Sequence, residues 1–191
     1  MALIVITGAV RSGKSAAAQR AALMRSRAGA RVVVAVFGQA EEDPEFTERI
    51  ERHRTDRPTA FRTLEATDSR SWMEGVTDDE LLVVECLGTL TALAMQEIGQ
   101  GETELASAEL LDFALNGIVE WVVRRSGDTI VVTNEVGWGV VPAFASGRIF
   151  RDALGRANAA FVTAADASYL AVDGRLLDLG RMPRDVQWPA D

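Results

Sequence analysis

The eight residues from Gly8 to Ser15 carry the clearest chemical pattern in the chain. They read Gly-Ala-Val-Arg-Ser-Gly-Lys-Ser and match the phosphate-binding pattern G-x-x-x-x-G-K-[ST]. In such a loop the backbone N–H groups point at phosphate oxygens, the lysine reaches the β- and γ-phosphates, and the final hydroxyl binds Mg²⁺. We therefore predict a site for a nucleoside triphosphate with Mg²⁺, formed by Gly8, Ala9, Val10, Arg11, Ser12, Gly13, Lys14 and Ser15.

The residues on both sides of this loop support the prediction. Residues 1–7 are apolar and rich in β-branched side chains, as expected of a buried parallel strand. Residues 16–28 are rich in Ala, Leu, Met, Gln and Arg, which favour a helix. A glycine-rich turn into a helix, without any ligand, is the alternative explanation.

Glu85 is a second candidate, because it ends the apolar run of residues 81–85. A carboxylate at the end of a buried strand, beside a phosphate-binding loop, is suited to hold Mg²⁺ directly or through water. We expect Glu85 to be a catalytic and metal-binding residue together with Lys14 and Ser15. The alternative is a charged residue that merely ends a strand.

His53 is the only histidine of the chain. It is surrounded in sequence by Arg49, Arg52, Arg54 and Arg57, although the whole protein has a net charge of −8. An imidazole among cations is suited to attack a polyphosphate, because the arginines neutralise the anionic electrophile. On a helix His53 would share a face with Phe46 and Ile50, so packing against the core is the alternative.

A third block spans residues 134–142 and reads Asn-Glu-Val-Gly-Trp-Gly-Val-Val-Pro. It follows the predicted strand 129–133. Two polar residues at a strand end, followed by a glycine-rich loop, fit the rim of an active site. Asn134 and Glu135 are accordingly candidates for shaping a nucleotide site.

Strands and helices alternate along the whole chain, which favours a single α/β domain with a mostly parallel sheet. Because ligands bind beyond the carboxyl ends of parallel strands, four strand ends should meet at one edge. They are Thr7-Gly8, Phe37-Gly38, Glu85-Cys86 and Asn134-Glu135. Asp173-Gly174 predicts a hairpin and thus an antiparallel final strand. The expected elements are strands at 1–7, 31–36, 61–65, 81–85, 129–133, 169–172 and 176–178, and helices at 16–28, 43–54, 68–76, 89–98, 105–125 and 149–165.

Composition narrows the class of protein. The acidic net charge argues against a general nucleic-acid surface, and no apolar run is long enough for membrane insertion. The single cysteine, Cys86, lies in a buried-looking strand and excludes an internal disulfide. With no signal pattern at the start, we expect a cytoplasmic protein.

Together, three blocks of the chain resemble the bifunctional adenosylcobinamide kinase / adenosylcobinamide-phosphate guanylyltransferase family of cobalamin biosynthesis. The family's G-G-A-R-S-G-K-S is similar to residues 8–15, and its R-I-x-x-H-x-x-x-R-P matches residues 49–58. Its N-E-V-G-x-G-I-V-P is similar to residues 134–142, and an R-x-F-R-D-x-x-G-x-x-N pattern follows at residues 148–158.

The resemblance implies a P-loop, RecA-like three-layer sandwich, ATP and GTP as substrates, and a homotrimer. It implies that adenosylcobinamide is phosphorylated and that GMP then passes from GTP to adenosylcobinamide phosphate through a guanylylated histidine, which by match is His53. Arg57 belongs to the matching block and is expected to contact the nucleotide.

Two other functions remain open on the residues alone. One is a different small-molecule kinase with the same loop, and the other is a nucleotide-dependent regulator that only binds. In both, His53 would be structural.

Overall fold

The computed structural model describes residues 1–37, 55, 57–99 and 104–186. The predicted helix 43–54, with His53, therefore lies outside the described residues. The described elements, in chain order, are β1 (Leu3–Gly8), α1 (Lys14–Arg27), β2 (Arg31–Phe37), β3 (Arg62–Ala66), the 3₁₀ helix η1 (Ser71–Gly75), β4 (Glu80–Glu85), α3 (Leu87–Ile98), α4 (Glu104–Arg124), β5 (Thr129–Val132), α5 (Ala145–Ala164), β6 (Ala167–Val172), β7 (Arg175–Asp178) and the 3₁₀ helix η2 (Leu179–Arg181).

The strands of the described residues form one seven-stranded sheet in the order β3-β2-β4-β5-β1-β6-β7. Every neighbouring pair is parallel except β6 and β7, which form the predicted antiparallel hairpin. β5 separates β1 from β4, so the strand that leads into the phosphate-binding loop lies one strand away from the strand that ends at Glu85. The predicted α/β P-loop, RecA-like architecture is confirmed.

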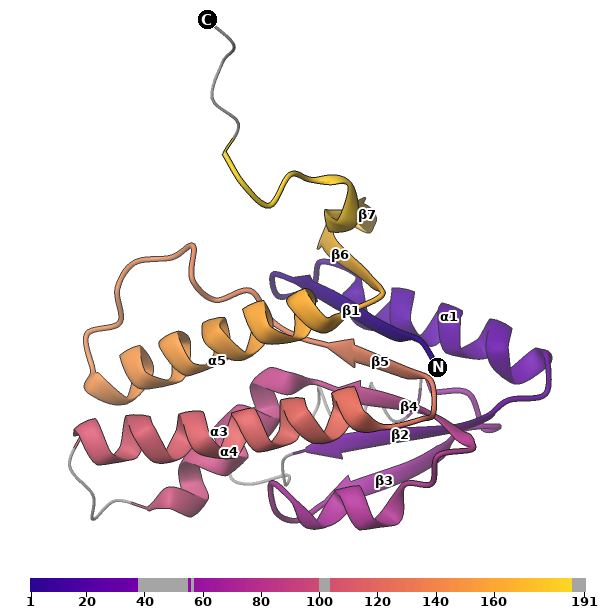
Figure 1. Ribbon diagram of the computed structural model, residues 1–191, viewed down its shortest axis with the longest axis horizontal. Helices are drawn as coiled ribbons and strands as arrows, with labels where there is room; N and C mark the ends of the chain where they lie inside the picture. The colour runs from indigo at the N-terminus through magenta and orange to yellow at the C-terminus, as the bar shows by residue number, and fades with distance from the viewer. Residues whose placement is uncertain (38–54, 56, 100–103, 187–191) are drawn as a thin grey trace, which may run out of the picture.

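Helices cover both faces of the sheet (Figure 1). On one face, α3, α4 and α5 pack over a large apolar cluster that includes Leu87, Leu115 and Phe161. On the other face, the alanines of α1 pack against alternate residues of the strands, as in Ala18 against the cluster of Val34 and Val83. Both faces of the sheet are buried, so its central strands are apolar on both sides. This is why each of them is a continuous hydrophobic run in the sequence.

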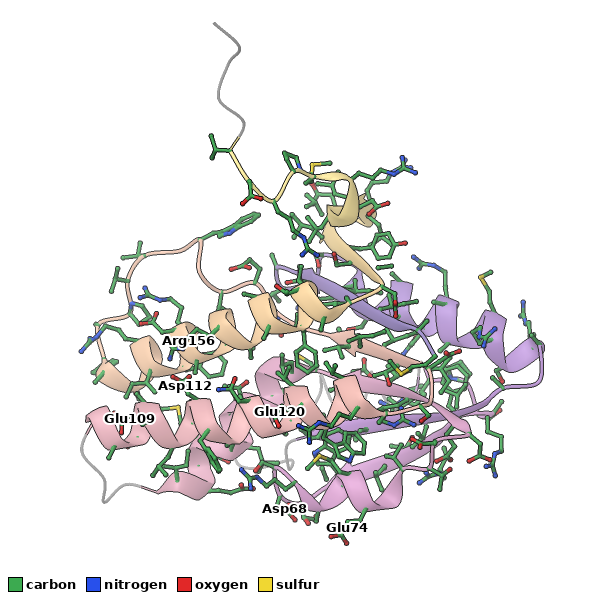
Figure 2. All side chains as sticks on the ribbon, in the orientation of Figure 1. Asp68, Glu74, Glu109, Asp112, Glu120 and Arg156 are labelled. Atoms are coloured by element: carbon green, nitrogen blue, oxygen red, sulfur yellow. The ribbon has the colours of Figure 1, made fainter. Side chains whose placement is uncertain are left out.

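The two long helices α4 and α5 lie side by side across the outer layer (Figures 1 and 2). Arg156 of α5 forms an ion pair with Asp112 of α4, with Nη2 and Oδ2 2.8 Å apart. Among the described residues, no helix is long and apolar enough to cross a membrane.

Two predicted helices differ from the structure. Residues 68–76 form only the short 3₁₀ helix η1. The Asp68 carboxylate accepts hydrogen bonds from the backbone N–H groups of Arg70 and Ser71, as a helix N-cap does, but the turn ends at Gly75 and Val76 is extended. α5 begins at Ala145 and not at residue 149. Ser146 and Gly147 are poor helix formers, but the Arg148 guanidinium bonds the carbonyls of Pro142 and Ala143 and holds the chain where it enters the helix.

Candidate active site

The phosphate-binding loop connects the end of β1 to the start of α1. Gly13 has φ of +94° and Arg11 has φ of +59°, so the backbone passes twice through the left-handed region before the helix begins. Lys14 is buried and its Nζ donates to the carbonyl oxygen of Ala9 at 3.0 Å, across the loop. Ser15, in the first turn of α1, is half-buried. The predicted residues 8–15 thus form one closed loop at the N-terminus of a helix, where the backbone favours anions.

Two buried hydroxyls of this region point to a polar ligand. Thr7 Oγ1 and Ser12 Oγ have no hydrogen-bond partner within the described part of the chain, and both residues are only 7% exposed. A buried hydroxyl without a partner costs free energy, so such groups in a native protein call for an explanation. Phosphate oxygens or waters bound in the loop would satisfy them.

The turn of the β6–β7 hairpin packs against the loop from outside. The backbone N–H of Gly174 donates to the carbonyl oxygen of Ser12 at 3.0 Å. A Cβ on Gly13 would lie 3.1 Å from the Gly174 Cα, and a Cβ on Gly8 would lie 2.6 Å from the Ala171 carbonyl oxygen. The two loop glycines therefore allow a close approach of backbone to backbone. The Asp173-Gly174 pair, predicted only as a turn, is a support of the phosphate-binding loop.

Glu85, at the carboxyl end of β4, is buried and forms an ion pair with Arg57. Arg57 Nη2 lies 3.1 Å from Glu85 Oε2, and Arg57 Nη1 donates to Thr63 Oγ1 on β3 at 3.0 Å. Both side chains are less than a tenth exposed. The sequence proposed a separate role for each of these residues, and the structure shows that they contact each other.

Asn134 and Glu135 follow β5, between β1 and β4. The Glu135 N–H donates to the Gly8 carbonyl oxygen at 3.1 Å, and the Cys86 thiol donates to Asn134 Oδ1 at 2.6 Å. Of the four strand ends expected at one edge, three are confirmed, namely Gly8, Glu85 with Cys86, and Asn134 with Glu135. The fourth continues from Phe37 to Gly38, which lies outside the described residues.

Asn158 ends the motif of residues 148–158 but was not among the predicted site residues, yet it holds this edge in place. Its side-chain amide donates to the Asn134 carbonyl at 2.9 Å, and its oxygen accepts from the Thr133 hydroxyl at 2.6 Å. It is buried among apolar residues of α5 such as Leu154 and Phe161. Its place at the end of that motif, and an amide on an otherwise apolar helix face, were the signals for a structural role.

The donors present fit a hydrated Mg²⁺ ion. Mg²⁺ is usually held by one or two protein oxygens together with phosphates and water. The Glu85 carboxylate at the strand edge and the Ser15 hydroxyl at the helix start are oxygen donors of that kind. No cluster of three or more His, Cys, Asp and Glu able to hold a metal occurs in the portion of the chain described above.

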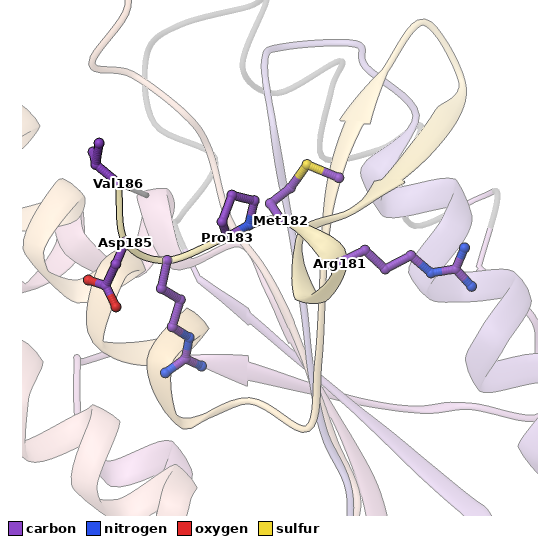
Figure 3. A pocket seen from close by; sticks show the side chains of 6 residues that line it. Arg181, Met182, Pro183, Asp185 and Val186 are labelled. Atoms are coloured by element: carbon purple, nitrogen blue, oxygen red, sulfur yellow. The ribbon is translucent and has the colours of Figure 1, made fainter. Parts of the chain in front are cut away.

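The segment after Glu135 is exposed and apolar. It carries four large hydrophobic side chains that are 62% exposed or more, namely Trp138, Val140, Val141 and Phe144. A separate open pocket lies at the chain end and is lined by residues 181–186 (Figure 3). None of the predicted site residues lines that pocket.

Comparisons with known proteins cover nearly the whole chain. A family model described as cobinamide kinase / cobinamide phosphate guanyltransferase matches residues 4–179. The bifunctional adenosylcobalamin biosynthesis protein CobU of Escherichia coli (strain K12) is 31% identical over 179 residues, which are 90% of this chain and 96% of the relative. The CobU protein of Salmonella typhimurium gives the same identity and coverage. The bifunctional adenosylcobalamin biosynthesis protein CobP of Pseudomonas aeruginosa is 33% identical over 157 residues, or 79% of this chain and 82% of the relative.

Proposed function

Because this chain belongs to the cobinamide kinase / cobinamide phosphate guanyltransferase family of bifunctional enzymes, we propose that its one described phosphate-binding loop serves both reactions. The first reaction phosphorylates adenosylcobinamide. The second transfers GMP from GTP to adenosylcobinamide phosphate and gives adenosylcobinamide-GDP. The observation that carries the proposal is the loop itself, with a buried lysine and two buried hydroxyls, one strand away from the carboxylate-bearing end of β4.

In the kinase reaction, a hydroxyl of adenosylcobinamide attacks the γ-phosphate of ATP or GTP. The bond from the phosphorus to the nucleotide's bridging oxygen breaks, and the acceptor hydroxyl loses its proton. Lys14 and the loop N–H groups stabilise the charge on the transferring group, since phosphoryl transfer depends mainly on positioning and electrostatics. A bound Mg²⁺ would neutralise part of the phosphate charge, with Ser15 and Glu85 as its protein ligands.

In the guanylyl transfer, His53 is the proposed nucleophile. Its imidazole nitrogen bonds to the α-phosphorus of GTP as the bond to pyrophosphate breaks, and a phosphate oxygen of the cobinamide substrate then displaces the histidine. Two easier displacements replace one difficult transfer. Support comes from the sequence motif and from Arg57, four residues after His53, which contacts Glu85 near the phosphate-binding loop.

From the resemblance to this family we also propose that the protein is cytoplasmic and assembles as a homotrimer. The exposed side chains of Trp138, Val140, Val141 and Phe144 offer apolar surface for contacts between copies. Light scattering of the purified protein would measure the mass of the assembly, and a monomer would contradict this part.

Intact-mass measurement tests the proposed mechanism. After incubation with GTP and Mg²⁺, the chain should gain the mass of one GMP, and adenosylcobinamide phosphate should remove it. An α,β-methylene analogue of GTP should give no adduct, because its bridging carbon cannot leave. Kinase turnover without any adduct would favour a small-molecule kinase with a structural His53, and nucleotide binding without turnover would favour a regulator.

A further inference from the structure

A network of hydrogen bonds fixes the point at which the exposed apolar segment after β5 leaves the sheet. Asn158 of α5 donates from its side-chain amide to the Asn134 carbonyl oxygen at 2.9 Å, and the Cys86 thiol donates to Asn134 Oδ1 at 2.6 Å. The next residue, Glu135, donates from its backbone N–H to the Gly8 carbonyl oxygen at 3.1 Å. The segment therefore starts at a fixed position beside the phosphate-binding loop.

The far end of the segment is also held in place. The Arg148 guanidinium donates to the carbonyl oxygens of Pro142 and Ala143 at 3.2 and 2.9 Å. A Cβ on Gly147 would lie 2.8 Å from the Pro142 Cβ, so the first turn of α5 packs directly against the proline. Between the two anchors, residues 138–141 carry three large apolar side chains that are 62% exposed or more. An apolar surface that is exposed and yet held at both ends has the features of a binding surface.

The acceptor of the kinase reaction must reach this edge of the sheet. The nucleotide binds beyond the carboxyl ends of the strands, and the hydroxyl of adenosylcobinamide has to meet its γ-phosphate there. That hydroxyl ends the aminopropanol arm of a large corrin ring, so the ring lies beside the phosphate site and not inside it. Trp138 follows Glu135 by three residues, which places the two Cα atoms within about 11 Å of each other.

From this placement we propose that Trp138 contacts the corrin ring of adenosylcobinamide and determines which acceptors the enzyme uses. The indole provides a large, rigid apolar surface for the ring while the arm extends to the phosphate-binding loop. Val140 and Val141, further along the segment, remain available to a second copy of the chain. The inference rests on the function proposed above, because it requires the acceptor and the nucleotide to meet at this edge.

Calorimetric titration with adenosylcobinamide tests the contact. β,γ-imido-ATP occupies the nucleotide site, so no phosphoryl group is transferred during the titration. Trp138→Ala should weaken acceptor binding by about tenfold or more, because an aromatic side chain buried by a ligand accounts for a large share of the affinity. Trp138→Phe should retain most of the affinity, since it keeps an aromatic face. The affinity for β,γ-imido-ATP should be equal in the wild type and both variants, which a general disturbance of the site would not allow.

The matched control is Phe113→Ala. Phe113 is 70% exposed on α4 and lies against Arg70, which follows the edge strand β3, with 5.7 Å from the guanidinium carbon to the ring centroid. Removal of this similarly exposed aromatic side chain should leave acceptor affinity at the wild-type value.

Unchanged acceptor affinity in folded Trp138→Ala would overturn the inference alone. If light scattering then shows that this variant has lost mass, a second copy of the chain occupies Trp138 instead. Failure of the wild type to bind adenosylcobinamide would overturn the proposed function as well.

If Trp138→Ala does not fold or assemble as the wild type does, the wild type itself provides the measurement. Hydroxyl-radical oxidation, read out by mass spectrometry of peptides, reports the exposure of each aromatic side chain. Addition of adenosylcobinamide to the protein with β,γ-imido-ATP should lower the oxidation of Trp138 severalfold and leave that of Phe113 unchanged. Equal oxidation of Trp138 with and without the acceptor would overturn the contact.

Discussion

The backbone N–H of Gly174 donates a hydrogen bond to the carbonyl oxygen of Ser12 at 3.0 Å, which joins the final hairpin to the phosphate-binding loop. The contact is possible because Gly174 has φ of +77° and follows Asp173 with φ of +48°, the geometry of a tight hairpin turn. The hairpin is therefore part of the nucleotide site, although it supplies none of the motif residues.

Gly174→Ala tests this support. Alanine in the left-handed region is strained by about 1 kcal/mol, so we expect a lower free energy of unfolding and a raised KM for the nucleotide. Gly155→Ala is the control, because Gly155 lies inside α5 with open space where a Cβ would be. Gly155→Ala should raise the free energy of unfolding by about 0.5–1 kcal/mol and leave the KM for the nucleotide unchanged. Equal nucleotide KM values in both variants would contradict a role for the hairpin.

Lys14→Ala should lose both the kinase and the guanylyltransferase activity. The reason is that the ammonium group stabilises phosphate charge in both reactions, if one loop serves both. The folded structure should persist, as judged by circular dichroism and thermal unfolding, because the loop backbone is also held by the hairpin and by α1. Loss of one activity alone, measured with each acceptor separately, would require a second nucleotide site.

Glu85→Gln should slow phosphoryl transfer by about 10²-fold or more and raise the Mg²⁺ concentration needed for half-maximal rate. The amide keeps the shape of the side chain and removes the charge that attracts the metal. Steady-state rates as a function of Mg²⁺ measure both effects. A metal dependence identical to that of the wild type would remove Glu85 from the metal site.

His53→Asn should abolish the GMP adduct and guanylyl transfer while substantial kinase activity remains. Asparagine can form hydrogen bonds but cannot act as the nitrogen nucleophile, and Lys14, Ser15 and Glu85 are intact. Mass spectrometry detects the adduct, and the release of phosphorylated acceptor measures the kinase step. Guanylyl transfer at the wild-type rate would mean that His53 has a packing role.

The lowered pKa of Asp128 predicts how the free energy of unfolding depends on pH. Burial opposes its charged form, but hydrogen bonds from the Ala2 N–H and from Arg25 outweigh that effect and lower the pKa of the carboxyl group. A lowered pKa in the folded state means that the stabilisation is complete above the unfolded-state pKa of about 3.9 and is lost as the pH falls through the lower folded value.

Asp128→Asn should therefore cost about 1 kcal/mol of unfolding free energy at neutral pH, and this difference should shrink below about pH 4. Urea unfolding at several pH values measures it. Asp112→Asn, which removes the exposed ion pair with Arg156, should cost less than about 0.5 kcal/mol at pH 7. A penalty for Asp128→Asn that does not change with pH would contradict the assigned cause.

Local sequence was sufficient for the order of the elements. The runs that form β1, β2, β4 and β5 are apolar on both faces, and the loop motif lies between a strand and a helix, so each could be identified without knowledge of its neighbours. The same alternation predicted which strand ends would meet, because parallel strands bring their carboxyl ends to one edge. Errors arose at helix ends, where a glycine stops a short turn, as at Gly75, or a side chain holds the entry to a helix, as Arg148 does.

Tertiary structure alone decided which side chains touch. Arg57 and Glu85 were separate candidates, and their ion pair forms because β2 lies between β3 and β4 and brings the residues near Thr63 to the end of β4. The contact of Gly174 with Ser12 likewise depends on β6 pairing with β1, which brings two strands from opposite halves of the chain side by side. Periodicity and propensity describe neighbours along the chain, whereas these contacts are set by sheet order and by the packing of residues that the sequence keeps far apart.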